Sequence, residues 1–152
     1  MYSKEEAKSL REDFWEAFRS MSARKRLRRK RPARWLQNNT GIKALNLRFH
    51  VDREVAQVGI DIETRNMEKR LELYEKLESV RKKLEEAMGE PMIWAMEYIR
   101  ENGKSVSRVY IQREGIDIYN QDTWQEAHTF MFEKMMLLED FYHEYRDFFK
   151  YG

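Results

Sequence analysis

Hydrophobic and polar positions follow two different periods along this chain, and each period predicts a different kind of element. Across residues 7–21, apolar side chains recur every three or four positions, which predicts a helix with one buried face. Residues 3–6 (SKEE) have the form of a capping box and start that helix. Because Pro32 disfavours helical geometry in the residue before it, we expect the helix to end no later than Arg31.

The next segment alternates with a period of two. Apolar and polar residues alternate across residues 45–51 and again across residues 56–62, which predicts two half-buried strands. Asp52 and Arg53 lie between them as a turn, and residues 38–41 (NNTG) form an earlier turn. The pair should therefore be a hairpin with one buried face and one polar face.

A second helix and a second hairpin follow. Helical spacing over residues 67–88 ends at residues 89–91 (GEP), where glycine and proline stop a helix. Residues 92–100 and 105–112 then flank Asn102-Gly103, a dipeptide typical of tight hairpin turns. We expect residues 115–118 (GIDI) to extend the last strand after a bulge.

The final helix is predicted to begin at Asp122, with Gln125 completing a capping box, and to continue to the end of the chain. Its apolar sector is wider than packing against one sheet requires. Phe132 and Met136 lie in the surplus part of that sector. We expect these two side chains to be buried either by the first helix or by a second copy of the final helix, which would make a homodimer.

The predicted order is α-ββ-α-ββ-α. Helices that gather on one face of an antiparallel sheet make an α+β fold, here two layers with a four-stranded antiparallel sheet built from two hairpins. The length of 152 residues fits one domain spanning residues 1–152, with residues 24–41 as a basic connection between the first helix and the sheet.

Composition excludes several kinds of chemistry. The chain has no cysteine, which excludes disulfides, zinc fingers, iron–sulfur clusters and a thiol nucleophile. It contains no signal-like apolar segment and no uncharged run near the ~20 residues of a membrane span, so we expect a cytoplasmic protein that does not enter membranes. No phosphate-binding loop, nucleophile motif or dinucleotide fingerprint is present, so neither a cofactor nor an enzymatic activity is predicted.

Charge is distributed unevenly. The formal net charge is only +2, yet residues 17–51 contain no Asp or Glu and carry a charge of +11, which leaves −9 on the rest. Eight of the eleven residues 24–34 are Lys or Arg. Clustered cations bind phosphates by releasing condensed counterions, and a nearby tryptophan could stack on a base. The candidate nucleic-acid-binding residues, or contacts for another polyanion, are Arg24, Lys25, Arg26, Arg28, Arg29, Lys30, Arg31, Arg34 and Trp35. The alternative is a solvated helix end, with Trp35 in the core.

The polar face of the sheet is a second candidate surface. Its expected members are Arg48, His50, Gln57, Asp61, Glu97 and Arg108. Within it, Asp61 and Glu63 point to the same side of one strand and could hold a divalent metal, as in metal-dependent nucleases. However, Arg65 stands where such a site would need Lys, and no third strand precedes a crossover helix. We therefore interpret both carboxylates as solvent-facing and expect no metal.

Four segments together resemble a bacterial family known as domain of unknown function 4268: MYSKEEAKSLREDFW, RWLQNNTGIKALNLRFHVD, AQVGIDIE and ENGKSVSRVYI, followed by an end rich in Tyr and Phe. Their order over almost the whole chain carries the resemblance. The resemblance implies a chain that occurs alone or attached to nuclease-type modules, and it implies no catalytic residue. The charge in RKRLRRKR is denser than in the usual pattern of that family.

The sequence thus predicts a small binding or accessory module that contacts nucleic acid or another polyanion through residues 24–34. Two alternatives stay open. One is a metal-dependent nuclease-like domain around Asp61 and Glu63, and the other is a structural domain that forms a homodimer or docks on a nuclease-type protein.

Overall fold

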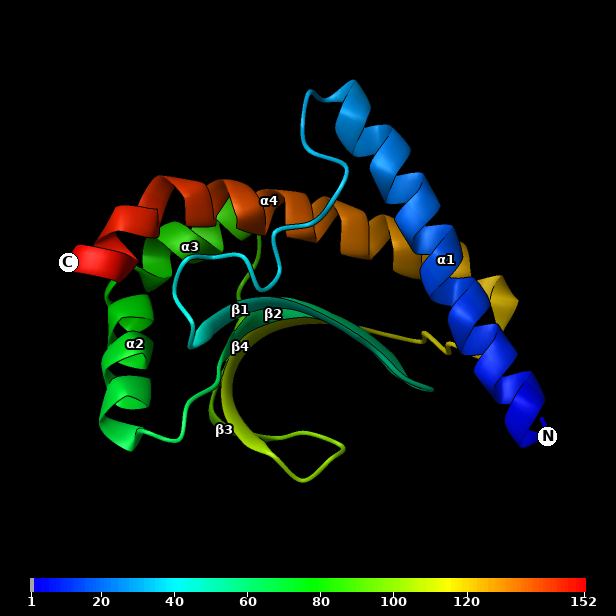
Figure 1. Cartoon of the computed structure of the whole chain (residues 1–152), viewed down its shortest axis with the longest axis horizontal. Helices are drawn as coiled ribbons and strands as arrows, with labels where there is room; N and C mark the ends of the chain where they lie inside the picture. The colour runs from blue at the N-terminus through cyan, green and yellow to red at the C-terminus, as the bar shows by residue number, and fades with distance from the viewer. Residues whose placement is uncertain (1) are drawn as a thin grey trace.

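The computed structural model describes residues 2–152 and has the predicted order of helices and strands, so the α+β class is confirmed (Figure 1). None of the helices in this part of the chain combines the length and the apolar character that a membrane span needs. The helices are α1 (Lys4–Arg28), α2 (Met67–Ser79), α3 (Arg81–Met88), the short 3-10 helix η1 (Gln121–Thr123) and α4 (Trp124–Tyr151). The strands are β1 (Leu45–Val51), β2 (Val55–Ile62), β3 (Ile93–Ile99) and β4 (Ser105–Glu114).

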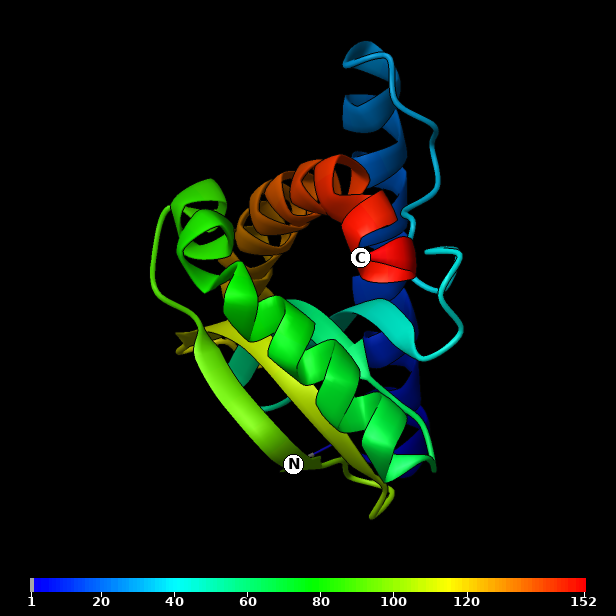
Figure 2. The same ribbon diagram turned by 90° about the vertical axis from the view of Figure 1, so that its left-hand side faces the viewer.

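The four strands form one antiparallel sheet in the order β1-β2-β4-β3. The sheet is strongly curved, with α4 lying across its convex side and no helix over its concave side (Figure 1; Figure 2). Alternate residues of β1, β2 and β4, among them Leu47, Ile60 and Val109, are almost fully buried in the core that the sheet shares with the helices. The other residues of the same strands turn toward the concave face, as the period of two requires.

Gly59 allows close approach of β2 and β4. It pairs with Tyr110, and a Cβ atom at position 59 would lie 2.4 Å from the carbonyl oxygen of Val109 and 2.5 Å from the Cβ of Tyr110. No other residue type fits without separating the strands, which is one reason for glycine inside a strand. The ring of Tyr110 in turn packs edge-on against Tyr98, with their centroids 5.7 Å apart.

A bulge in β3 corrects the predicted polar face. Ala95 pairs with Arg108 and Tyr98 with Val106, so Met96 and Glu97 together lie opposite one residue of β4. The extra residue shifts the alternation, and Tyr98 takes the position over the concave face that the unbroken pattern assigns to Glu97. Glu97 is exposed, and the prediction that it belongs to the polar face is wrong.

The carbonyl group of the bulge is bound from the other side of the sheet. Met96 O accepts hydrogen bonds from Ser107 Oγ at 2.5 Å and from Arg70 Nη2 at 2.8 Å. Arg70 lies on α2, is 4% exposed, and also donates to Ser107 Oγ and Ser105 Oγ. A single guanidinium therefore satisfies the irregular backbone and attaches α2 to the sheet.

Two element boundaries differ from the sequence prediction. The predicted helix 67–88 is interrupted at Val80, whose backbone (φ −115°, ψ 18°) is not helical. The interruption lets α2 bury Leu77 against the sheet end while α3 buries Leu84 and packs on α4. β4 ends at Glu114, and residues 115–118 run irregularly beside the β1–β2 turn, where two of their N–H groups donate to the carbonyl groups of residues 52 and 54.

The predicted cap of α4 is also wrong, whereas that of α1 is confirmed. Asp122 lies within η1, and its backbone N–H donates to the side chain of Asn120. α4 begins at Trp124 without a side-chain cap. Asn120 instead binds the start of η1, because its side chain accepts the N–H of Asp122 and its carbonyl group accepts the N–H of Thr123. At α1, by contrast, Ser3 and Glu6 form the reciprocal hydrogen bonds of a capping box.

Glu90 joins the segment after α3 to both layers of the fold. Its carboxylate accepts hydrogen bonds from Arg113 Nη1 and Nη2 on β4, at 2.9 and 2.7 Å, and forms an ion pair with Lys134 Nζ on α4 at 2.8 Å. The hydrogen bonds from Arg113, followed by that from Lys134, lower the pKa of Glu90 from 4.5 to about 2.

We predict that protonation of Glu90 destabilises the fold in acid. Because its pKa is lower in the folded state, the stabilisation is fully present above pH 4.5 and is lost as the pH falls toward 2. Because solvent screens these partly exposed groups, losing the interactions of ionised Glu90 should lower the free energy of unfolding by on the order of 1–2 kcal/mol. Urea unfolding between pH 2 and 6 measures this. Glu90→Gln should remove that part of the pH dependence, whereas the exposed Glu133→Gln should keep it. Identical acid profiles for the wild type and Glu90→Gln would contradict the prediction.

Candidate nucleic-acid interface

The C-terminal end of α1 and the loop after it project beyond the sheet and form the top of the molecule in Figure 1. The chain reverses direction there. The N–H groups of residues 29–31 all donate to carbonyl groups of residues 25–27, and Lys30 adopts a left-handed backbone conformation (φ 59°). Such a conformation is costly for a residue other than glycine, so the surrounding contacts must hold it.

A buried ion pair provides that support. Arg26 is 3% exposed and Glu139 on α4 is 1% exposed, and Arg26 Nη1 donates to Glu139 Oε1 at 2.6 Å. The same guanidinium donates to Pro32 O at 2.7 Å and to Arg34 O at 3.0 Å, which closes the loop around it. The second oxygen of Glu139 accepts the backbone N–H of Leu36 at 2.6 Å.

Two predicted contact residues are therefore structural. Arg26 has almost no accessible surface and all its donor nitrogens are bonded, so it offers nothing to a phosphate. Trp35 is half-buried, stacked parallel to Phe18 with centroids 6.1 Å apart, and covered by Arg26 at 4.3 Å from its ring centroid. Arg31 is partly withdrawn as well, because it forms ion pairs with Asp140 and Glu139. A tryptophan beside a basic run is ambiguous in sequence, and here it belongs to the core.

The same segment covers the surplus apolar sector of α4. The ring of Phe132 packs against that of Trp35, with their centroids 5.5 Å apart. Met136 Sδ accepts a hydrogen bond from Arg26 Nη1 at 3.4 Å. Phe132 is 1% exposed and Met136 is 5% exposed within the single chain. These two side chains were expected to be buried either by the first helix or by a second copy of the final helix. α1 and the loop after it bury them, so the wide apolar sector of α4 does not require a homodimer.

Six cations of the basic run point into solvent. None of them forms an ion pair with another residue in the described range 2–152. Two also lie over the ring of Phe132: Lys25 Nζ at 5.3 Å and the guanidinium of Arg29 at 5.1 Å from its centroid. We call these six residues the basic tip: Arg24, Lys25, Arg28, Arg29, Lys30 and Arg34. The basic tip therefore carries six exposed positive charges that no carboxylate of residues 2–152 neutralises.

On the concave face, three arginines converge on one carboxylate. Asp61 is fully buried and accepts two hydrogen bonds from Arg108, at 2.6 and 2.9 Å, and one from Arg100 at 2.7 Å. Arg48 Nε lies 3.6 Å from the same carboxylate. Burial and the adjacent guanidinium of Arg100 lower the pKa of Arg48. The site is thus positive overall, and the ring of Tyr98 lies 4.0 Å from the Arg108 guanidinium.

The expected neighbours Arg48, Asp61 and Arg108 lie together on this face, whereas His50 lies nearer the β1–β2 turn and contacts Asp52 at 2.9 Å. Sequence reasoning missed Arg100. Arg100 directly follows β3, and the bulge in that strand places Tyr98, and Arg100 two residues later, on the face that carries Asp61. The sequence does hold one signal. Arg100 precedes the Asn102-Gly103 turn by two residues, which could have suggested that the Arg100 side chain reaches the neighbouring strands.

The two carboxylates of the nuclease alternative are already paired with cations, and the prediction that both face solvent is wrong for Asp61, which is fully buried. Glu63 accepts from Lys104 Nζ at 2.8 Å and from Arg100 Nη1 at 2.9 Å, and the hydrogen bond from Lys104 lowers the pKa of Glu63. A divalent cation at Asp61 and Glu63 would have to displace these groups and approach three guanidiniums at close range. Coulombic repulsion therefore opposes a metal at this position.

One other group has the composition of a metal site. Among residues 2–152, His50, Asp52 and Glu101 place one ligand atom each within 4.8 Å of one another. They line a cavity of about 300 Å³ together with Arg48 and Arg100, whose charges weaken cation binding there.

The comparisons with known proteins give a family. A family model described as Domain of unknown function (DUF4268) matches residues 10–146. The chain belongs to this family. The resemblance inferred from its segments is therefore confirmed, and the match includes the basic tip, the whole sheet and most of α4. No curated protein and no solved structure matches the chain. The description of the DUF4268 family states no activity, so the function is argued from the geometry of this member.

We predict that Glu139→Gln destabilises the protein by about 3–5 kcal/mol, because it leaves the buried charge of Arg26 uncompensated. Asp140→Asn is the matched control on the same helix. Asp140 is an exposed carboxylate that pairs with Arg31, so its loss should cost less than about 1 kcal/mol. Urea unfolding at pH 7 measures both variants. An equal loss of unfolding free energy in the two variants would show that the buried ion pair of Arg26 and Glu139 contributes no more to stability than the exposed pair of Arg31 and Asp140.

Proposed function

We propose that this DUF4268 member is a nucleic-acid-binding module whose contact surface is the basic tip of α1. The single observation that carries the proposal is the set of six exposed cations without an ion-pair partner in the described chain, gathered on two helical turns and the following loop. Cationic surfaces of this kind bind phosphate backbones by releasing condensed counterions. The family description neither supports nor opposes this function.

The distribution of charge favours one contact surface over a diffuse one. Residues 17–51 carry a charge of +11 and the rest of the chain carries −9. An acidic body repels a polyanion, so an approaching nucleic acid is steered toward the basic tip. The projection of α1 beyond the sheet keeps the rest of the surface away from the bound strand (Figure 1).

The contacts should be made to phosphates and not to bases. Trp35 packs in the core, so the one aromatic residue within or next to the basic run is not free to stack. Lys and Arg contacts to phosphate position a protein without reading sequence, whereas specificity needs side chains that reach base edges. We therefore propose binding with little sequence preference, as suits an accessory module that brings a nuclease-type partner to its substrate.

The scaffold reduces the entropic cost of such binding. Arg26 and Arg31 hold the end of α1 and its loop against Glu139 and Asp140. The cations of the basic tip are thus presented from backbone that is already ordered, and little backbone freedom has to be lost on association.

We predict weak binding to duplex DNA that falls steeply with salt. If the tip neutralises about five phosphates, the slope of log K against log salt should be about −4.5. Arg28→Ala with Lys30→Ala removes two exposed cations that make no contact with Phe132, and should flatten the slope by nearly 2. Fluorescence anisotropy of a labelled duplex across 20–200 mM salt measures this.

Lys82→Ala with Lys83→Ala is the matched control. It removes the same charge from exposed positions on α3, away from the basic tip, and should leave the slope unchanged. Absence of binding at the lowest salt would reject the proposed function. Equal effects of the two double variants would show that only net charge, and not the basic tip, is responsible.

A further inference from the structure

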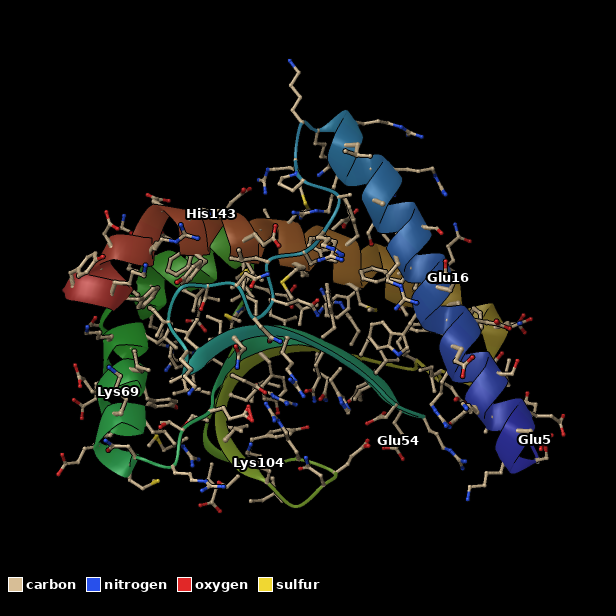
Figure 3. All side chains as sticks on the ribbon, in the orientation of Figure 1. Glu5, Glu16, Glu54, Lys69, Lys104 and His143 are labelled. Carbon is tan, nitrogen blue, oxygen red and sulfur yellow. The ribbon has the colours of Figure 1, made fainter. Side chains whose placement is uncertain are left out.

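A large cavity lies away from the basic tip. It has a volume of about 1460 Å³ and is lined by residues 41–44 before β1, residues 63–66 between β2 and α2, one side of α2 as far as Lys76, the start of β4 with Lys104 before it, and the end of α4. None of its lining residues belongs to the run 24–34. Lys69 on α2 and Lys104 beside the β3–β4 turn, both labelled in Figure 3, are among them.

The lining is strongly positive, with seven basic residues against two acidic ones. Three of the basic residues have structural partners. Arg70 binds the bulge of β3, Lys76 Nζ donates to Phe149 O at 3.3 Å, and Lys104 forms an ion pair with Glu63 at 2.8 Å. These three hold together the elements that surround the cavity.

The other four cations have no ion-pair partner within residues 2–152. They are Lys43, Arg65, Lys69 and Lys150, and all four are exposed. They come from three segments that are distant in sequence, namely the loop before β1, the start of α2 with the residues before it, and the end of α4, and the fold brings these segments together. Like charges that gather around one cavity repel each other, so their arrangement is most favourable when an anion lies between them.

The end of α4 contributes through a close backbone approach. Gly41 has a left-handed backbone (φ 83°), and a Cβ atom there would lie 2.9 Å from Lys150 Nζ. Because glycine occupies this position, the ammonium group of Lys150 lies directly against the loop that carries Lys43. Two of the four free cations are thereby held at the same wall of the cavity.

The cavity also has an apolar wall. Ile42 is half-buried there, and the side chain of Met67 is 58% exposed at the start of α2. A flexible thioether of this kind packs well against the face of an aromatic ring. The site therefore combines several free cations with a surface suited to a flat apolar group.

We infer that this cavity binds a nucleoside phosphate, with the phosphates among Lys43, Arg65, Lys69 and Lys150 and the base against Met67 and Ile42. A single carboxylate would leave most of the free positive charge uncompensated, whereas a nucleoside triphosphate carries enough negative charge to balance it. At about 1460 Å³ the cavity is larger than the ~300–1,000 Å³ typical of small-molecule pockets, so a nucleoside triphosphate has room in it. This site does not depend on the proposed function of the basic tip.

The same chemistry has two sources, a free nucleotide and the terminal phosphate of a nucleic-acid strand. Both present a phosphate group next to a nucleoside, so both fit the cavity. A comparison of ATP with a short single strand that carries either a 5′-phosphate or a 5′-hydroxyl group distinguishes them.

Isothermal titration of the whole chain with ATP, AMP and adenosine at low salt tests the site. We expect affinity to fall in that order, with no heat from adenosine, because the phosphates supply most of the attraction. Arg65→Glu with Lys69→Glu should weaken ATP binding at least tenfold. Arg28→Glu with Lys30→Glu makes the same change of charge on the basic tip and should leave ATP binding within about twofold, because neither residue lines the cavity.

A 5′-phosphorylated strand that binds more tightly than its 5′-hydroxyl form, and only when Arg65 and Lys69 are intact, would assign the site to strand ends. Tight binding of ATP alone would assign it to free nucleotides. The inference is overturned if neither ligand binds, or if the two double variants weaken ATP binding equally while circular dichroism shows both to be folded. Loss of duplex binding in the basic-tip variant with intact ATP binding would separate this site from the proposed function.

Discussion

The carboxylate of Glu139 is the group on which the arrangement of this chain most depends. It is buried on α4, far in sequence from the segment that it organises, and it accepts hydrogen bonds from Arg26 at the end of α1 and from the backbone of Leu36 beyond the loop. A buried carboxylate is stable only when cations and donors surround it completely. These groups come from a highly basic segment that folds back over α4. The same segment also covers Phe132 and Met136.

Arginine has two distinct uses in this fold. Arg26, Arg70 and Arg108 are almost fully buried, and each binds several oxygen atoms that would otherwise lack a partner: carbonyl groups of a loop, the carbonyl of a bulge, or the carboxylate of Asp61. The planar guanidinium suits this role because it presents several donors in fixed directions. Other cations close to them in sequence face solvent without partners. Density of charge in the sequence therefore does not distinguish a structural arginine from one that is free to bind.

Local patterns predicted most of the fold. The capping box at Ser3, the period of two in the first hairpin and the Asn102-Gly103 turn each depend on residues close together in the sequence, and the structure contains all of them. What the patterns could not predict depends on contacts between distant segments. The bulge at Met96 and Glu97 needs Arg70 from α2, and the break at Val80 separates helices that pack on different layers. Similarly, the burial of Arg26 follows from Glu139, a residue more than a hundred positions away. The cavity beside α2 was not predicted for the same reason, since its four free cations come from three separate segments of the chain.

Gly59 has a consequence for how sequences of the family can diverge. Many tight contacts in a sheet tolerate paired change, in which a larger side chain on one strand is matched by a smaller one opposite. Such paired change is not possible at Gly59. The atoms nearest to a Cβ at this position include the carbonyl oxygen of Val109 and the Cα of Tyr110, which are backbone atoms that every residue type retains. No substitution at position 110 could make room. Position 59 should therefore remain glycine while the sheet keeps this curvature, whatever residue stands at position 110.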